Sequence, residues 1–266
     1  MATLVCFHAH PDDEAISTGG LMARAADAGH RVVLVCATRG EQGEPQEGVL
    51  TDGEALWERR VVELATSCEL LGAEPPRFLD YEDSGMMGEP TNDNPACFWQ
   101  ADPEEAVARL TTILEEVDAD VLTIYDDHGG YGHPDHLQVH RVGLTAAQQL
   151  ELDHVYEATI NRDRVKEMMS QAQDPDSGVD LDESEVDVET FGTPNDDISF
   201  ELDVRAVIAR KRRSIAAHRS QVGPDSFFLS MPDEVFEMAF GFEWFNVPGR
   251  SGTGGPDIVE MLPGLA

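Results

Sequence analysis

Through the first 150 residues, short apolar runs alternate with longer segments in which apolar residues recur at helical spacing. The run 31–38 (RVVLVCAT) is the clearest buried strand, and 54–71 is a long amphipathic segment that ends before Gly72, a common helix C-terminal signal. This alternation predicts an α/β fold with a doubly wound, Rossmann-like and mostly parallel sheet. The further strands expected are 4–9, 77–79 and 121–125, and the further helices expected are 16–28, 103–117 and 135–150.

The remainder of the chain is less regular. The elements expected there are a strand at 154–160, helices at 162–171 and 204–218, and an aromatic strand at 240–247. Residues 172–187 are rich in Asp, Glu, Ser, Pro and Gly, which predicts an irregular surface insertion. We therefore expect a Rossmann-like catalytic core at 1–160 and a smaller irregular C-terminal lobe at 161–266, which packs on the core and carries an acidic insertion at 172–197.

The net charge of the chain limits which partners it can bind. The chain has 52 acidic residues against 18 basic ones, a formal net charge of −34, and the acidic residues are spread along the whole sequence. Such a surface repels phosphate backbones and anionic lipids, which argues against nucleic-acid and membrane partners. A generally acidic, solvated surface is typical of halophilic proteins in a salt-rich cytoplasm. A cation-binding surface or a docking site for a basic partner is the alternative.

Two further features bear on the cellular setting. The sequence shows neither a signal peptide nor an apolar run long enough to span a membrane, so a cytoplasmic protein is expected, and a homo-oligomer is compatible with this composition. The four cysteines lie far apart and form no C-x-x-C pair, which predicts buried, reduced thiols.

Two segments dense in metal-ligand and acid–base residues follow predicted strands. The first is 8–14 (HAHPDDE), and the second is 131–136 (YGHPDH). Open α/β sheets bind their ligands at the carboxyl ends of parallel strands, and in the usual strand order the fourth strand lies beside the first. Taken singly, a His beside Pro is often a turn residue, and acidic residues can serve a helix N-terminus. Two such clusters at matching strand ends instead predict a metal site.

The spacing within these segments suits one catalytic zinc, which takes three protein ligands and keeps one open position. His10, Asp13 and His136 would supply two imidazoles and a carboxylate. Asp12 and His133 would lie close by without coordinating, as a base and an acid should. Ferrous iron accepts the same ligand types. Strand alternation turns His8 away from the site, and packing or surface positions are expected for four scattered histidines, His30, His140, His154 and His218.

At these residues the sequence resembles the PIG-L/LmbE-type zinc deacetylases, which share an A-H-P-D-D-E segment and a later H-P-D-H segment, here residues 9–14 and 133–136. The resemblance is closer to the mycothiol branch, the N-acetylglucosaminyl-inositol deacetylases and mycothiol S-conjugate amidases. The other matching stretches are 38–44 (TRGEQGE), 83–88 (DSGMMG), 129–136 and 217–221 (AHRSQ).

This resemblance implies a role for each matching position. It implies that the predicted ligands His10, Asp13 and His136 hold the metal. Asp12 is then the general base, His133 the acid or electrostatic partner of the developing oxyanion and leaving amine, and Tyr131 a second oxyanion donor. The positions that would hold the polyol part of the substrate are Arg60 and Asp83, joined by Glu41.

The activity implied is a zinc-dependent hydrolysis of an N-acyl amide, such as acetyl, on a small glucosamine-type substrate. Deacetylation of an N-acetylglucosaminyl-inositol-like compound and cleavage of a mycothiol conjugate both remain open. H-x-H-x-D also opens dinuclear metallo-β-lactamase-like sites, although a His follows the Asp there, whereas Asp13-Glu14 follow here and Pro11 interrupts the segment. A non-catalytic, metal-dependent carbohydrate-binding protein is the other alternative, against which the intact Asp12 and His133 argue. No G-x-S-x-G elbow, P-loop or G-x-G-x-x-G supports a serine hydrolase or a nucleotide site.

Overall fold

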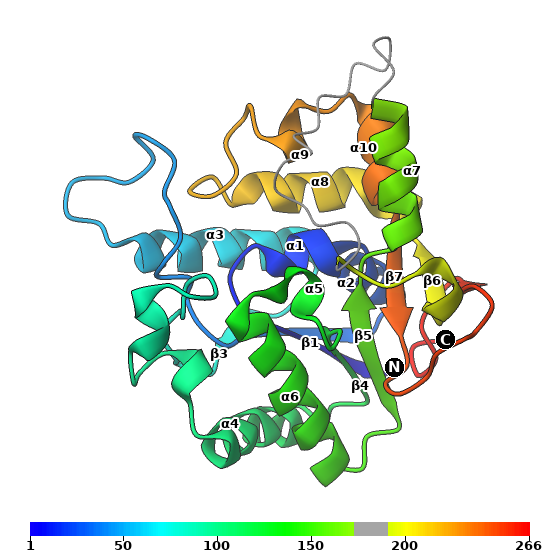
Figure 1. Cartoon of the computed structure of the whole chain (residues 1–266), viewed down its shortest axis with the longest axis horizontal. Coiled ribbons are helices and arrows are strands. Elements are labelled where there is room, and N and C mark those ends of the chain that lie inside the picture. Colours follow the sequence, from blue (N-terminus) through cyan, green and yellow to red (C-terminus); the bar gives the residue numbers. More distant parts are fainter. Residues whose placement is uncertain (173–190) are drawn as a thin grey trace.

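The computed structural model describes residues 1–172 and 191–266, and its eight strands lie in one sheet in the order β3-β2-β1-β4-β5-β7-β6-β8 (Figure 1). The first five of these strands in spatial order pair in parallel, whereas β7 runs antiparallel to both of its neighbours. The strands are β1 (Thr3–His8), β2 (Arg31–Cys36), β3 (Arg77–Phe78), β4 (Val121–Tyr125), β5 (His154–Thr159), β6 (Phe200–Asp203), β7 (Phe242–Asn246) and β8 (Asp257–Val259).

Helices cover both faces of this sheet, so the central strands β1 and β4 are buried along their whole length. In β1, Leu4 and Cys6 pack into one core cluster, whereas Val5 and Phe7 pack into another on the opposite face. The first cluster includes residues of α2 (Gly19–Asp27) and α3 (Leu56–Leu71), and the second includes residues of α4 (Pro103–Glu116) and α6 (Pro134–Gln149).

The predicted doubly wound arrangement is confirmed, because β4 pairs directly with β1. The single helix expected at 16–28 is wrong in detail: the chain forms α1 (Asp13–Ser17) and then α2, separated by Thr18 at φ −134°. Two contacts account for the break. The Thr18 hydroxyl lies 2.8 Å from Nε2 of His8, and Gly20 packs so closely on Val204 that a Cβ there would lie 2.4 Å from the valine Cβ.

The C-terminal part of the chain extends the same sheet through β6, β7 and β8, of which only β7 was expected. Within this part, a buried ion pair places Lys211 Nζ 2.7 Å from Glu243 on β7. The Glu243 carboxylate also accepts the backbone N–H groups of Gly20 and Leu21 at 2.6 and 2.8 Å, at the start of α2. The helices of this part are α7 (Arg162–Ala172), α8 (Ile208–Ala217), α9 (Phe227–Ser230) and α10 (Asp233–Phe240).

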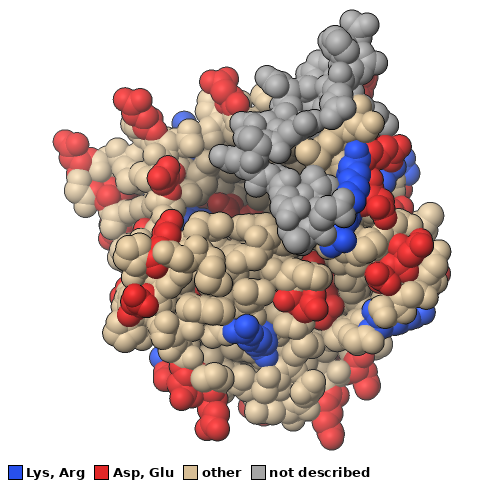
Figure 2. Space-filling view, in the orientation of Figure 1, with Lys and Arg blue, Asp and Glu red and all other residues tan. Residues whose placement is uncertain are grey.

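Residues 173–190 of the expected acidic insertion lie outside the described part of the chain. Figure 2 shows acidic side chains spread over the visible face and far fewer basic ones, in keeping with the net charge of −34. The four cysteines are free and buried, as expected. Among the described helices, none is long and apolar enough to cross a membrane.

Candidate metal and active site

The two histidine-rich segments meet at the carboxyl ends of β1 and β4, as their positions in the sequence predict. Residues 9–14 lead from β1 into α1, and residues 131–136 lead through α5 (Gly129–Gly132) into α6. The imidazole centroid of His10 lies 4.6 Å from that of His133 and 5.4 Å from that of His136.

The side chains of His10, Asp13 and His136 meet at one carboxylate oxygen. Oδ2 of Asp13 lies 3.4 Å from Nδ1 of His10 and also 3.4 Å from Nε2 of His136. Ligand atoms bound at about 2.0–2.2 Å in a tetrahedral zinc site lie roughly 3.3–3.6 Å from one another. The spacing of the predicted ligands therefore suits one tetrahedral cation between them.

Hydrogen bonds determine which nitrogen of each imidazole is free. Nδ1 of His136 lies 3.1 Å from the carbonyl oxygen of Gly129, which can only accept, so Nδ1 carries the proton. Nε2 of His10 lies 3.2 Å from Oδ2 of Asp135 and 3.4 Å from Oδ1 of Asp83, so the proton of His10 is on Nε2. The remaining lone pairs, Nδ1 of His10 and Nε2 of His136, both face Asp13.

When His10 carries only its Nε2 proton, the site brings acceptor atoms together without a donor, and Nε2 of His136 is buried and has no hydrogen-bond partner. Burial by itself would lower the pKa of His10, but the carboxylates of Asp83, Asp13 and Asp135 raise it well above its usual value. The same negative field favours a bound cation. A metal-ligating histidine whose second nitrogen donates to a carboxylate or a carbonyl is the usual outer-shell arrangement, so these residues fit a divalent metal.

His133 is close enough to be considered as a ligand, because its nitrogens fall within 4.8 Å of those of His10 and His136. Its Nδ1, however, accepts the backbone N–H of Asp135 at 3.1 Å and caps α6. Burial lowers the pKa of His133 to about 4, so the ring is neutral near pH 7 and its proton is on Nε2. A protonated nitrogen donates hydrogen bonds and does not bind a metal.

Asp12 lies at the turn between β1 and α1 with φ at 105°, a conformation that costs a non-glycine residue about 1–3 kcal/mol. Two contacts hold it there: its backbone N–H donates to Oε2 of Glu14 at 2.9 Å, and its Oδ2 lies 3.1 Å from Nη2 of Arg60. Burial raises the pKa of Asp12 to about 6, although Arg60 acts in the opposite direction. This pKa suits a general base near neutral pH.

Arg60, expected to hold substrate, is only 4% exposed. Its guanidinium also donates to the carbonyl oxygens of Pro11 at 2.5 Å and Gly40 at 2.8 Å. The contacts with Pro11 and Asp12 brace the turn that presents Asp12, the contact with Gly40 links it to a second loop, and the buried Nε has no hydrogen-bond partner.

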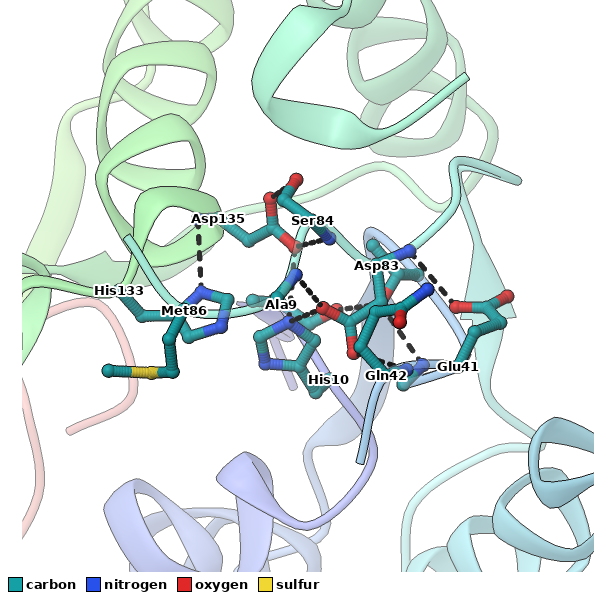
Figure 3. A network of polar contacts seen from close by, with 12 residues as sticks. Ala9, His10, Glu41, Gln42, Asp83, Ser84, Met86, His133 and Asp135 are labelled. Carbon is teal, nitrogen blue, oxygen red and sulfur yellow. Dashed lines mark hydrogen bonds and ion pairs between the residues drawn. The ribbon is translucent and has the colours of Figure 1, made fainter. Parts of the chain in front are cut away.

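The other two expected substrate residues lie on the Nε2 side of His10 (Figure 3). Asp83 accepts the backbone N–H groups of Gly85 and Gln42 at 2.9 and 3.2 Å, and its own backbone N–H donates to Glu41 at 3.1 Å. The expected oxyanion donor Tyr131 is 52% exposed, and its ring centroid lies 5.0 Å from that of His136.

A cavity of about 590 Å³ opens onto the site. Asp12, Asp13, Tyr131 and His136 belong to its wall. Apolar and aromatic side chains of β5, α7, α9, α10 and β7 line most of the remainder, among them Ile160, Val165, Met168, Phe228, Phe240 and Trp244.

Two groups of residues that support the site were not predicted from the sequence. Asp135 stands inside the H-P-D-H segment, and its carboxylate bonds His10 and accepts from the backbone N–H of Ser84 at 3.0 Å as well as from its hydroxyl. Membership of the motif was the only signal for it. The buried Glu14 accepts from Nε2 of His218 at 2.8 Å, a pairing across 204 positions that no local pattern announces. His8 instead turns away from the metal residues, as expected, and bonds Tyr125 at 2.9 Å.

The chain is also similar to known proteins. The family profile described as PIG-L, GlcNAc-PI de-N-acetylase, matches residues 5–147. A 1D-myo-inositol 2-acetamido-2-deoxy-alpha-D-glucopyranoside deacetylase of Acidothermus cellulolyticus is 40% identical over 91% of this chain and 87% of its own. A protein of the same name from Thermobifida fusca is 38% identical over 97% and 96%. Among solved structures, the N,N'-diacetylchitobiose deacetylase of Pyrococcus horikoshii superposes with a TM-score of 0.61 at 20% identity, covering 93% of this chain and 84% of its own, which shows a shared fold. The chain belongs to the PIG-L de-N-acetylase family.

Proposed function

We propose that this protein is a zinc-dependent deacetylase that hydrolyses the N-acetyl amide of a glucosaminyl-inositol-like substrate. Two lines of support converge on this function. The relatives named for that reaction are 38–40% identical over nearly the whole chain. The observation that carries the proposal is the contact of two imidazole lone pairs with the same carboxylate oxygen, Oδ2 of Asp13, at 3.4 Å each.

In this proposal the metal is held by Nδ1 of His10, Oδ2 of Asp13 and Nε2 of His136. Zinc bound there would act as a Lewis acid that polarises the amide carbonyl and lowers the pKa of the attacking water. Ferrous iron accepts the same ligands. Another group of potential ligands, His10, Asp83 and Asp135, uses the nitrogen of His10 that carries its proton, so one metal per chain is expected rather than a dinuclear centre.

Asp12 takes the proton of the attacking water, and Arg60 holds its carboxylate in position through the 3.1 Å contact. As the carbonyl oxygen gains negative charge, the Nε2–H of His133 and the hydroxyl of Tyr131 donate to it. The proton received by Asp12 is then available to the departing amine. Asp12 and Tyr131 both line the cavity beside the metal ligands, where the amide would lie.

For the polar part of the substrate we propose contacts on the side where Glu41 and Asp83 lie, with Arg60 bracing the loop through the carbonyl of Gly40. The mycothiol-conjugate amidase reaction remains the second candidate, because the resemblance in sequence extends to both enzymes of that branch. A non-catalytic sugar-binding role would need neither the poised Asp12 nor the proton on Nε2 of His133.

The test is release of primary amine from N-acetylglucosaminyl-inositol by zinc-restored protein in high salt, with and without a chelator. Chelator-sensitive release supports the proposal. Release from a mycothiol conjugate alone would favour the amidase. Metal-dependent binding of the sugar without any amine would overturn the enzymatic proposal in favour of a binding protein.

A further inference from the structure

The apolar cavity begins at the reacting centre and is far larger than an acetyl group requires. Asp12, Asp13 and His136 form part of its wall, and its volume of about 590 Å³ lies within the range of sites for whole drug-sized ligands, about 300–1,000 Å³. An acetyl group would place a single methyl there.

The two sides of the site differ in chemistry. On the Nε2 side of His10, Asp83 and Glu41 present carboxylates, and neither belongs to the cavity wall. The cavity wall instead consists mostly of apolar side chains, such as Ile160, Val165 and Met168. Sugar hydroxyls buried there would lose water without gaining partners, at a cost of about 1–3 kcal/mol each, so the polyol belongs on the polar side.

Several of the charged groups in the wall are engaged in ion pairs. Lys211 and Glu243 pair at 2.7 Å, and Glu243 also accepts two backbone N–H groups, while Arg164 pairs with Glu167 at 3.2 Å. Met168 and Met169 supply flexible side chains that adapt to ligands of different shape. The cavity is therefore suited to an apolar ligand rather than to a charged one.

We propose that this cavity is an acyl-binding subsite and that the enzyme prefers amides whose acyl group is apolar and longer than acetyl. The inference rests on the proposed amide hydrolysis: with the amide carbonyl beside the residues that would hold the metal and the sugar nitrogen toward the polar side, the acyl substituent would extend into the cavity. Each added methylene buried there should raise kcat/KM about fourfold, because burying one methylene contributes about 0.8 kcal/mol.

The test compares N-acetyl, N-butanoyl and N-hexanoyl derivatives of glucosaminyl-inositol. From acetyl to hexanoyl, kcat/KM should rise on the order of a hundredfold. An N-acetylglucosamine glycoside with a hexyl aglycone adds similar apolar surface to the other end of the substrate. If the hexyl aglycone raises kcat/KM over the parent N-acetyl compound by more than the N-hexanoyl group does, the aglycone binds in the cavity and the proposal is overturned.

Two substitutions on α10 form a matched pair. Ala239 lines the cavity, whereas its neighbour Met238 is 43% exposed and does not. Ala239→Phe should cut the hexanoyl-to-acetyl ratio of kcat/KM at least tenfold by filling the cavity, and Met238→Phe should leave the ratio unchanged. An unchanged ratio in folded Ala239→Phe protein would overturn the proposal.

Calorimetric binding to zinc-loaded Asp12→Asn protein separates this inference from the proposed reaction. If the parent protein hydrolyses no compound, but the variant binds the hexanoyl compound on the order of a hundredfold more tightly than the acetyl one, the proposed reaction is refuted and the acyl subsite is supported. If the acetyl compound is hydrolysed and longer acyl groups neither bind more tightly nor react faster, the reaction stands and the subsite is refuted.

Discussion

Nδ1 of His133 accepts a hydrogen bond from the backbone N–H of Asp135 at 3.1 Å. This contact closes the first turn of α6 and leaves the proton of the neutral ring on Nε2. It separates two histidines of one H-P-D-H segment, because Nδ1 of His136 donates to Gly129 and leaves its Nε2 free for a metal. Nε2 of His133 is therefore a hydrogen-bond donor, whereas Nε2 of His136, three residues later, is an unprotonated lone pair.

This difference predicts opposite outcomes for the two alanine variants. His136→Ala should abolish stoichiometric zinc binding, because it removes the buried nitrogen that faces Asp13. His133→Ala should keep one zinc per chain while kcat falls on the order of 10²–10⁴-fold. The measurement is zinc content by atomic emission after dialysis, together with amine release.

The control for these variants is His140→Ala, one turn further along α6. Nδ1 of His140 bonds the carbonyl of Tyr125 at 3.1 Å, so this variant should retain both zinc and activity. Loss of zinc from His133→Ala, with His140→Ala unaffected, would make His133 a ligand and contradict the assignment of its proton.

Arg60→Lys tests whether Arg60 acts through Asp12. A lysine cannot reproduce the planar fork that bonds Asp12, Pro11 and Gly40 together, so kcat should fall by about 10–100-fold while KM changes less than threefold. Steady-state kinetics with the N-acetyl substrate measures both values. A raised KM with unchanged kcat would instead place Arg60 on the substrate.

Glu157 on β5 predicts a pH-dependent loss of stability. Burial, with a contribution from Asp126, raises its pKa from 4.5 to about 7, and its carboxylate lies 3.5 Å from Nδ1 of His140. The folded protein therefore retains a proton that the unfolded chain releases between pH 4.5 and 7. The stabilisation from this group is complete below pH 4.5 and is lost as pH rises to 7, a change of about 3 kcal/mol.

Glu157→Gln should remove this part of the pH dependence. Relative to the parent protein, the variant should gain about 2–3 kcal/mol in the free energy of unfolding between pH 4.5 and pH 8, measured by urea denaturation. Glu151→Gln, at an exposed position after α6, is the control and should show no such gain. Parallel pH profiles for the parent and Glu157→Gln would refute the shift.

The net charge of −34 predicts that salt stabilises the fold. Raising KCl from 0.1 to 1 M shortens the screening length from about 10 to 3 Å and weakens repulsion among the surface carboxylates. We expect Tm to rise by at least roughly 2–4 °C, equivalent to about 1 kcal/mol. A variant with exposed Glu47, Asp52, Glu69 and Glu115 changed to Gln or Asn should show a smaller rise. A Tm independent of salt would show that surface repulsion does not limit stability.

Local patterns in the sequence predicted much of the fold. The strand at 121–125 has the predicted bounds, and α3 begins two residues later than expected and ends at Leu71 as predicted. The break at Thr18 was missed because its causes, His8 and Val204, lie outside the helix. Strands β6 and β8 were missed because strands of only three or four residues carry little periodicity.

The sequence by itself predicted the candidate metal ligands and their place at the ends of β1 and β4, because apolar periodicity and motif spacing are properties of neighbours along the chain. Only the tertiary structure decided which imidazole nitrogens are free, that Arg60 braces Asp12, and that an apolar cavity opens beside the metal ligands. The reason is physical: these features arise from contacts between segments such as His10 and Asp135, 125 residues apart. Their partners are chosen by how the helices and the sheet pack, which no local pattern encodes.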